Sequence, residues 1–240
     1  MYEVIGLIAK PLGYLLSFLY GFIQNYGITL LAFTLIVKLC LYPLYAKQVK
    51  STVRMGEMQP KMKELQAKYA NDKQTLNAKL MEMYKREKFN PMSGCLPILL
   101  QMPIIFALFM LLRNPTRFMP GDEMLIATHE SFFWMMDLSQ PDPWIMPILA
   151  AMTTFISFVQ TQAQQGAMTE ANAAMAPMMK MMKYFFPLMI LVMGRSFPAG
   201  LIIYWFFGQA VQIVFNLHLN KVRKRLKEES EMRMRSRAYL

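Results

Sequence analysis

The sequence predicts an all-α integral membrane protein: a five-transmembrane-helix core with a cytoplasmic helical hairpin and an N-terminal interfacial helix. Three observations support this fold class. Hydrophobic residues make up 55% of the 240 residues, more than a soluble chain with a single core covers with polar surface. Five apolar stretches each approach the ~20 residues that a helix needs to cross a bilayer. Basic residues gather in two segments, which is typical of the cytoplasmic parts of a membrane protein.

The first segment, 1–20, is predicted to be an amphipathic helix in the membrane interface. Spacings of three and four residues place five apolar side chains on one face: Ile5, Ile8, Leu12, Leu15 and Leu19. If this segment crossed the membrane, Lys10 and Pro11 would lie at mid-depth, so an interfacial position is favoured. The segment has neither a basic n-region nor a small-residue cleavage site, and it therefore does not fit a signal peptide.

The predicted five-helix core covers residues 21–220. Its spans have the approximate bounds 26–45, 95–112, 144–160, 175–194 and 199–219. The fourth span begins with Lys180 and Lys183, whose long side chains can reach the interface. The two cysteines, Cys40 and Cys95, indicate neither a disulfide framework nor a metal site.

Residues 46–90 are predicted to form a helical hairpin that projects from the membrane. Apolar side chains form one stripe before the turn and another after it: Val49, Val53, Met58, Met62, Leu65 and Tyr69, then Leu76, Leu80 and Tyr84. The stretch ANDKQ, 70–74, offers the turn. We expect Pro60 to break or restart the first helix, because a proline inside a helix loses a hydrogen bond. The hairpin is either a docking element or a solvated structural element.

Charge predicts the orientation in the membrane. Segment 44–93 holds eleven Lys and Arg against five Asp and Glu, and segment 217–240 holds eight against three. Both segments are predicted to be cytoplasmic, including a basic tail at 221–240. The loop 113–143 has the reverse balance and is predicted to lie outside. With five spans, the N-terminus is outside and the C-terminus is cytoplasmic.

The formal net charge of +11 does not require a nucleic-acid partner. Positive-inside bias and anionic lipid headgroups already account for both basic segments. DNA is therefore not expected as a partner, whereas the tail could contact ribosomal RNA by electrostatic attraction.

Three long stretches follow one another in a family order. They are VKLCLYPLYAKQVKSTVRMGEMQPKMKEL from Val37, NPMSGCLPILLQMPIIFALFMLL from Asn90, and FPAGLIIYWFFGQAVQIVFN from Phe197. Through these stretches the chain resembles, over about residues 21–220, the YidC-type membrane protein insertases of the YidC/Oxa/Alb family. Without a large extracytoplasmic domain before the core, it is similar to the family's short members from single-membrane bacteria.

The resemblance implies a non-enzymatic insertase and chaperone of the bacterial plasma (inner) membrane. A hydrophilic groove in the inner leaflet would host the polar segment of an arriving protein, whose own hydrophobic helix then completes insertion. The implied partners are nascent membrane proteins with one or two spans and membrane lipids, together with the ribosome, the signal-recognition machinery and the Sec translocon. No cofactor is expected, since no G-x-x-x-x-G-K-S/T motif for ATP occurs.

Lys38 is the one charge within the apolar run LAFTLIVKLCLYPL, and charges inside spans are costly and usually functional. It lies nine residues before Lys47, about 13 Å along a helix, which is too far for complete snorkelling. By the resemblance it matches a groove position that is usually arginine, where a cation would attract acidic residues of a substrate. Lysine keeps the charge but lacks the bidentate fork of arginine. The alternative is a structural lysine bound to a backbone carbonyl.

Five further residues are candidates for the substrate-binding groove: Thr34, Gln101, Gln160, Trp205 and Gln209. Thr34 precedes Lys38 by one helical turn and so shares its face. By the resemblance, Gln160 and Trp205 match polar and aromatic groove positions. Each glutamine has an alternative role as a hydrogen-bonding contact between helices, and Trp205 has one in packing or in anchoring at the interface.

Methionine is frequent, with 25 residues, and seven lie between Met168 and Met189. Flexible methionines there would form either an adaptable apolar cap or ordinary filling of helix surfaces.

Two other functions remain as alternatives: a small transporter or channel that uses Lys38, and a scaffold whose hairpin recruits a soluble partner. Transporters usually contain internal repeats, and no repeat is visible in this sequence.

Overall fold

The computed structural model describes residues 2–87, 96–119, 123–164 and 175–238. Its helices are α1 (Tyr2–Ile23), α2 (Tyr26–Lys68), α3 (Lys73–Arg86), α4 (Leu96–Arg113), α5 (Pro115–Phe118), α6 (Glu123–Ala127), α7 (Ile145–Gln164), α9 (Met175–Gly194) and α10 (Ala199–Ala238). Within the described ranges there is one isolated β-bridge, between Phe132 and Met135, and no strand. The predicted all-α class is confirmed.

Each of the five predicted spans corresponds to one helix, namely α2, α4, α7, α9 or α10, although the spans 95–112 and 144–160 begin one residue before α4 and α7. Three of these helices are long and apolar enough to cross a membrane, over Tyr26–Ser51, Ile145–Ala163 and Ala199–Glu229. The apolar parts described for α4 and α9 are shorter, Gln101–Arg113 and Met181–Gly194. Helices satisfy their own backbone hydrogen bonds, as hydrocarbon requires. Cys95 and Met168 lie outside the described residues.

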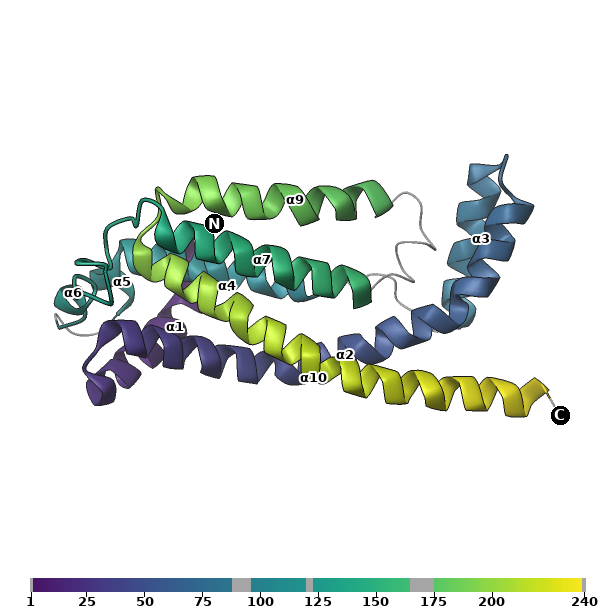
Figure 1. Ribbon diagram of the computed structural model, residues 1–240, viewed down its shortest axis with the longest axis horizontal. Coiled ribbons are helices and arrows are strands. Elements are labelled where there is room, and N and C mark those ends of the chain that lie inside the picture. Colours follow the sequence, from purple (N-terminus) through teal and green to yellow (C-terminus); the bar gives the residue numbers. More distant parts are fainter. Residues whose placement is uncertain (1, 88–95, 120–122, 165–174, 239–240) are drawn as a thin grey trace.

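Helix α1 also contains a stretch, Gly6–Ile23, that is long and apolar enough to cross a membrane. The helix continues through Pro11, and Lys10 is exposed. It packs against α4 and α2, and in Figure 1 the purple α1 runs at an angle to α2. The interfacial position of segment 1–20 stays a prediction.

The bundle is organised around α10, which packs against α2 on one side and against α7 on the other. Helix α9 covers α7 in turn, so that α9, α7, α10 and α2 follow one another across the bundle (Figure 1). The start of α10 is the most deeply buried part, since all residues from Leu201 to Trp205 are buried. Phe33 of α2 and Leu108 of α4 belong to the same core cluster.

The expected break at Pro60 does not occur, because α2 is one helix of 43 residues that contains both Pro43 and Pro60. A proline removes one backbone hydrogen bond, while the bonds of the turns before and after it remain. Met58 and Met62, on either side of Pro60, are both buried in the hairpin, and their packing favours continuous helix. Figure 1 shows that α2 changes direction on its way into the hairpin.

The turn of the hairpin lies where the sequence predicts it, between the end of α2 at Lys68 and the start of α3 at Lys73. Asp72 begins α3, and its carboxylate accepts hydrogen bonds from the hydroxyl and the backbone N–H of Thr75. These bonds lower the pKa of Asp72 because they stabilise its charged form. The hairpin has a core cluster of its own, built on Met58, Met62 and Met83. Met83 is absent from the predicted stripes.

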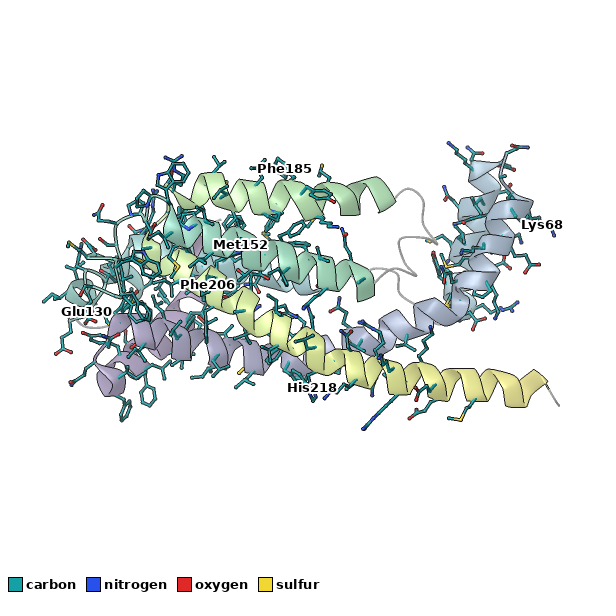
Figure 2. All side chains as sticks on the ribbon, in the orientation of Figure 1. Lys68, Glu130, Met152, Phe185, Phe206 and His218 are labelled. Carbon is teal, nitrogen blue, oxygen red and sulfur yellow. The ribbon has the colours of Figure 1, made fainter. Side chains whose placement is uncertain are left out.

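The two ends of the molecule differ in charge as predicted. The hairpin and the C-terminal part of α10 lie at one end, and α5, α6 and the following loop lie at the other (Figure 1). Lys68 and Glu130 mark these ends in Figure 2.

Glu130 attaches the loop between α6 and α7 to the ends of α1 and α2. Its carboxylate accepts hydrogen bonds from the Tyr20 hydroxyl and from the backbone N–H of Tyr26, the latter at 2.7 Å.

Because the hairpin has a separate core, weakening that core should leave the bundle intact. Met62→Ala removes a fully buried side chain and should destabilise the hairpin by about 2 kcal/mol. Hydrogen exchange followed by mass spectrometry should then show faster exchange in α3 and unchanged exchange in α7 and α10.

Met81→Ala is the matched control, because Met81 lies on α3 and is exposed. This variant should exchange like the parent. Faster exchange of α7 or α10 in the Met62→Ala protein would show that the hairpin and the bundle unfold together.

Candidate functional site

Lys38 lies deep in α2, 12 residues after the helix begins at Tyr26, or about 18 Å along it. Its side chain is only 4% exposed. The ammonium Nζ donates a hydrogen bond to Oε1 of Gln101 on α4 at 3.3 Å. The ring of Tyr45, two turns further along α2, has its centroid 5.8 Å from the same nitrogen. Both neighbours are neutral.

Gln101 extends this contact to α10. Its amide Nε2 donates to the hydroxyl of Tyr204 at 3.2 Å, so one chain of hydrogen bonds joins α2, α4 and α10. In the part of the chain that the structure describes, Lys38 forms no ion pair with a carboxylate. The buried cation therefore has one hydrogen-bond acceptor and one aromatic ring beside it, and neither carries a negative charge that would compensate its own.

Thr34 and Lys38 face α10 together, as their spacing predicts. The Thr34 hydroxyl donates to the carbonyl of Leu30 at 2.6 Å, so it is engaged by its own helix. Gly208 on α10 lies opposite both side chains. A Cβ there would lie 3.4 Å from Cε of Lys38 and 3.6 Å from Cγ2 of Thr34. A larger side chain at position 208 would need the space that the lysine stem occupies.

Gln160 belongs to a different polar cluster, between α7 and α10. Asn216 is buried there, and its Nδ2 donates to Oε1 of Gln160 at 3.4 Å and to Oγ1 of Thr161 at 3.5 Å. Gln212 donates in turn to Oδ1 of Asn216 at 3.2 Å. The cluster joins two helices, which is the contact role left open for Gln160 in the sequence.

Trp205 lies in the core, with 8% of its surface exposed. Its indole Nε1 donates to Oγ1 of Thr154 on α7 at 2.8 Å, and that hydroxyl donates to the carbonyl of Ala150 at 2.6 Å. The ring centroid of Phe186 on α9 is 5.8 Å from that of Trp205. Trp205 therefore joins α10 to α7 and α9, whereas its neighbour Tyr204 faces Gln101.

The structure thus brings together Lys38, Thr34 and Gln101, and it separates them from Gln160 and from Trp205. Gln209 is half-buried on α10 and makes no hydrogen bond to another described residue. Hydrophobic patterning does not point to the partners of these side chains, which are Tyr45, Thr154, Tyr204, Gly208, Gln212 and Asn216. A weaker signal is present in the sequence, because Tyr204, Gly208, Gln212 and Asn216 recur every four residues along α10.

Metal binding has no support in the described residues, where no three His, Cys, Asp or Glu side chains lie close enough to hold an ion. What the arrangement offers is a buried positive charge with polar neutral neighbours, inside an apolar bundle. A side chain of this kind has its strongest interaction with a carboxylate. The fold and this site define a multi-pass helical membrane protein with a buried cationic site.

The family is shown by comparison with known proteins. A family model described as 60Kd inner membrane protein matches residues 18–228, and the chain belongs to this family. It is 38% identical over 222 residues to the membrane protein insertase YidC of Geobacter sp. (strain M21), covering 92% of this chain and 38% of that protein. It is 37% identical over 215 residues to the YidC of Fusobacterium nucleatum, covering 89% of this chain and 95% of that one.

A solved structure agrees with the same family. The crystal structure of an active YidC insertase with its first transmembrane domain resolved matches with a TM-score of 0.56 at 25% sequence identity. The match covers 89% of this chain and 45% of the other. The resemblance to YidC-type insertases that the sequence motifs carry is confirmed. The chain spans 38% of the Geobacter relative and nearly all of the Fusobacterium relative.

The bond between Trp205 and Thr154 should stabilise the contact of α10 with α7. Thr154→Val keeps the shape of the side chain but leaves the buried indole N–H without an acceptor, at a cost of about 1 kcal/mol. We expect a lower melting temperature in detergent, and a smaller effect of the same change when Trp205→Phe has already removed the donor.

Thr153→Val is the matched control. The Thr153 hydroxyl donates only to carbonyls of its own helix, those of Leu149 and Ala150. Its loss should change stability little. The prediction fails if Thr154→Val and Thr153→Val lower the melting temperature equally and if the effect of Thr154→Val is the same with and without Trp205→Phe. The bond to Trp205 would then contribute nothing specific to stability.

Proposed function

We propose that this chain is a non-enzymatic membrane protein insertase and chaperone that assists the insertion and folding of transmembrane helices. Two relatives with similarity along most of this chain carry the name membrane protein insertase, and a YidC insertase shares the fold. In the proposal, a hydrophilic site within the bundle hosts a polar segment of the substrate. The substrate's own hydrophobic helix supplies the free energy of insertion.

The observation that carries this proposal is the buried ammonium of Lys38 with an amide as its hydrogen-bond acceptor. A carboxylate would accept the same hydrogen bond and would add a Coulombic attraction to the ammonium that a neutral amide lacks. An acidic residue on a substrate tail would therefore be a better partner than Gln101. Exchange of the amide for the carboxylate would hold the tail at mid-depth and compensate the charge of Lys38 at the same time.

Five further residues are proposed to contact the substrate at different points along its path: Thr34, Gln101, Gln160, Trp205 and Gln209. Lys38 and Gln101 lie side by side, and they would form the first contact with an acidic residue. Gln160 lies with Asn216 and Gln212 two to three turns along α10 from Tyr204, in the direction of the hairpin. A polar segment entering from that end would meet the amides before it meets the lysine.

The proposed partners follow from this role and from charge. Nascent membrane proteins with one or two spans are the substrates, with or without the Sec translocon. The ribosome and the signal-recognition machinery would meet the hairpin and the basic helix end, and anionic lipids would lie beside both. We propose that the N-terminus is outside and the C-terminus is cytoplasmic in the inner membrane.

The proposed orientation predicts which loops react from outside. In a Cys40→Ser/Cys95→Ser background, a cysteine in place of Glu123 should react with an impermeant thiol reagent added to intact cells. A cysteine in place of Lys73 or Ser236 should be shielded, because its end of the molecule carries the basic residues. Permeabilised cells are the control, since every position should react there. Labelling of position 73 from outside would reverse the orientation.

The role of Lys38 is tested by changing its charge and that of the substrate. Lys38→Arg should retain activity, whereas Lys38→Met should lose it, most for substrates with acidic tails. Lys38→Glu should be worst for those substrates because attraction becomes repulsion. The Met variant should fold at least as well as the parent, since a charge at mid-membrane costs about 2–3 kcal/mol on insertion scales. The measurement is protease protection of a single-span substrate with zero, one or two acidic residues in its N-tail.

Gln101→Glu provides a sharper variant in the same assay. It places a carboxylate within reach of Lys38, so the charge is compensated inside the protein and the acidic tail loses its advantage. We expect reduced insertion of acidic tails and little change for the neutral tail. Equal insertion of all three substrates by Lys38→Met and by the parent would remove the electrostatic role. Loss of the Met variant from the membrane would show that Lys38 is structural.

A further inference from the structure

The loop between α6 and α7 contains a tight turn with an apolar tip. Phe132 and Met135 exchange backbone hydrogen bonds of 2.8 and 3.0 Å, which leaves Phe133 and Trp134 at the turn. Phe133 is 79% exposed, Trp134 46% and Met136 90%. We call these three residues the apolar tip. Leu125 and Ile126 of α6, earlier in the same loop region, are exposed as well.

The backbone of the tip is strained. Phe133 has φ of 52°, in the left-handed region that residues with bulky side chains rarely adopt. A strained backbone persists only where surrounding contacts enforce it. Within the described chain the Phe133 ring contacts mainly its neighbours Phe132 and Trp134, and most of its surface stays exposed. With this backbone conformation, the Phe133 ring points away from the protein.

The turn is attached firmly to the ends of two spans. The Phe132 ring occupies the position that a Cβ on Gly27 would need, 2.1 Å from that point, so the ring packs directly on the first turn of α2. Glu130 binds the backbone N–H of Tyr26 on the same turn. On the other side of the turn, the carbonyl of Leu138 accepts a hydrogen bond of 3.0 Å from Gly200 at the start of α10.

A third attachment joins the tip to the beginning of α7. The Trp134 indole N–H donates to Oδ2 of Asp142 at 2.6 Å. The other oxygen of the same carboxylate accepts the backbone N–H groups of Trp144 and Ile145, both at 2.9 Å, and so caps the beginning of α7. The apolar stretch of α7 starts at Ile145, so this hydrogen bond holds Trp134 beside the beginning of that stretch.

We propose that the apolar tip inserts into the lipid headgroup and acyl boundary at this end of the bundle. Aromatic rings are favoured at that depth, and the indole N–H of Trp134 is already satisfied by Asp142. The carboxylates beside the tip also have partners within the protein: Glu130 binds Tyr20 and Tyr26, and Asp137 binds His129 at 3.0 Å. The exposed apolar surface continues to the beginning of α7, through Trp144 just before the helix and Ile145 at its first position.

The lipid contact is tested with an environment-sensitive fluorophore on single cysteines in the Cys40→Ser/Cys95→Ser protein. The full chain is placed in phosphatidylcholine–phosphatidylglycerol vesicles, with labels at Phe133→Cys and Met136→Cys. Both labels should emit at shorter wavelength than a label at Asn71→Cys. Lipids brominated on the acyl chain should quench them several-fold more strongly, and iodide in the buffer several-fold less.

Asn71 supplies the aqueous reference, because it lies exposed in the turn of the hairpin. Ser131→Cys is the matched control within the loop, since Ser131 is polar and exposed and lies just before the turn. It should be quenched more by iodide than the tip labels are. Trp134 gives a measurement without a label in a Trp144→Phe/Trp205→Phe protein, where brominated lipid should quench its emission.

Two results would overturn the proposal. Iodide quenching at positions 133 and 136 as strong as at Asn71, with Trp134 unaffected by brominated lipid, would show that the tip faces water. Shielding of all three positions from both quenchers would show that protein covers the tip, either a second copy of this chain or another partner.

Discussion

The packing of α10 between α2 and α7 is the contact on which the rest of the bundle depends. One face of α10 carries Tyr204 and Gly208 toward α2 and α4, and the adjacent face carries Trp205 toward α7 and α9. In a bilayer, apolar side chains gain little by leaving lipid for protein, so close packing and hydrogen bonds between helices determine the arrangement. Small and polar residues of α10 supply both.

The same packing explains how a lysine is accommodated at mid-depth. Gly208 of α10 lies beside the stem of Lys38 and leaves room for it, while Gln101 and Tyr45 lie near its ammonium. The ammonium of lysine carries three N–H donors, and among the described residues one amide oxygen accepts from it. An arginine would bring a planar fork of five donors to the same place. An anion at this site would therefore add both a hydrogen-bond acceptor and a compensating charge.

The sequence was sufficient for features that depend on local pattern. The helices that correspond to the five predicted spans, the turn after Lys68 and the shared face of Thr34 and Lys38 all follow from hydrophobic runs or from helical spacing, and the structure agrees. Three of these five helices are long and apolar enough to cross a membrane, as is α1. Pro60 was misjudged because the cost of one lost hydrogen bond was weighed without the packing of Met58 and Met62. Hydrogen bonds between different helices could not be predicted from local patterns. Gln101 and Tyr204 are 103 residues apart, and Trp205 and Thr154 are 51 apart, so only the packed bundle reveals them.

The continuity of α2 through Pro60 gives the molecule a mechanical character. One helix begins at the contact with Glu130, passes Lys38 at mid-depth and ends at the turn of the hairpin. No loop interrupts this path, so the hairpin and the segment that holds the lysine are joined by one helix, which changes direction between them. By thermodynamic reciprocity, a ligand that displaces the hairpin and an anion bound at Lys38 change each other's affinity whenever they favour different tilts of α2.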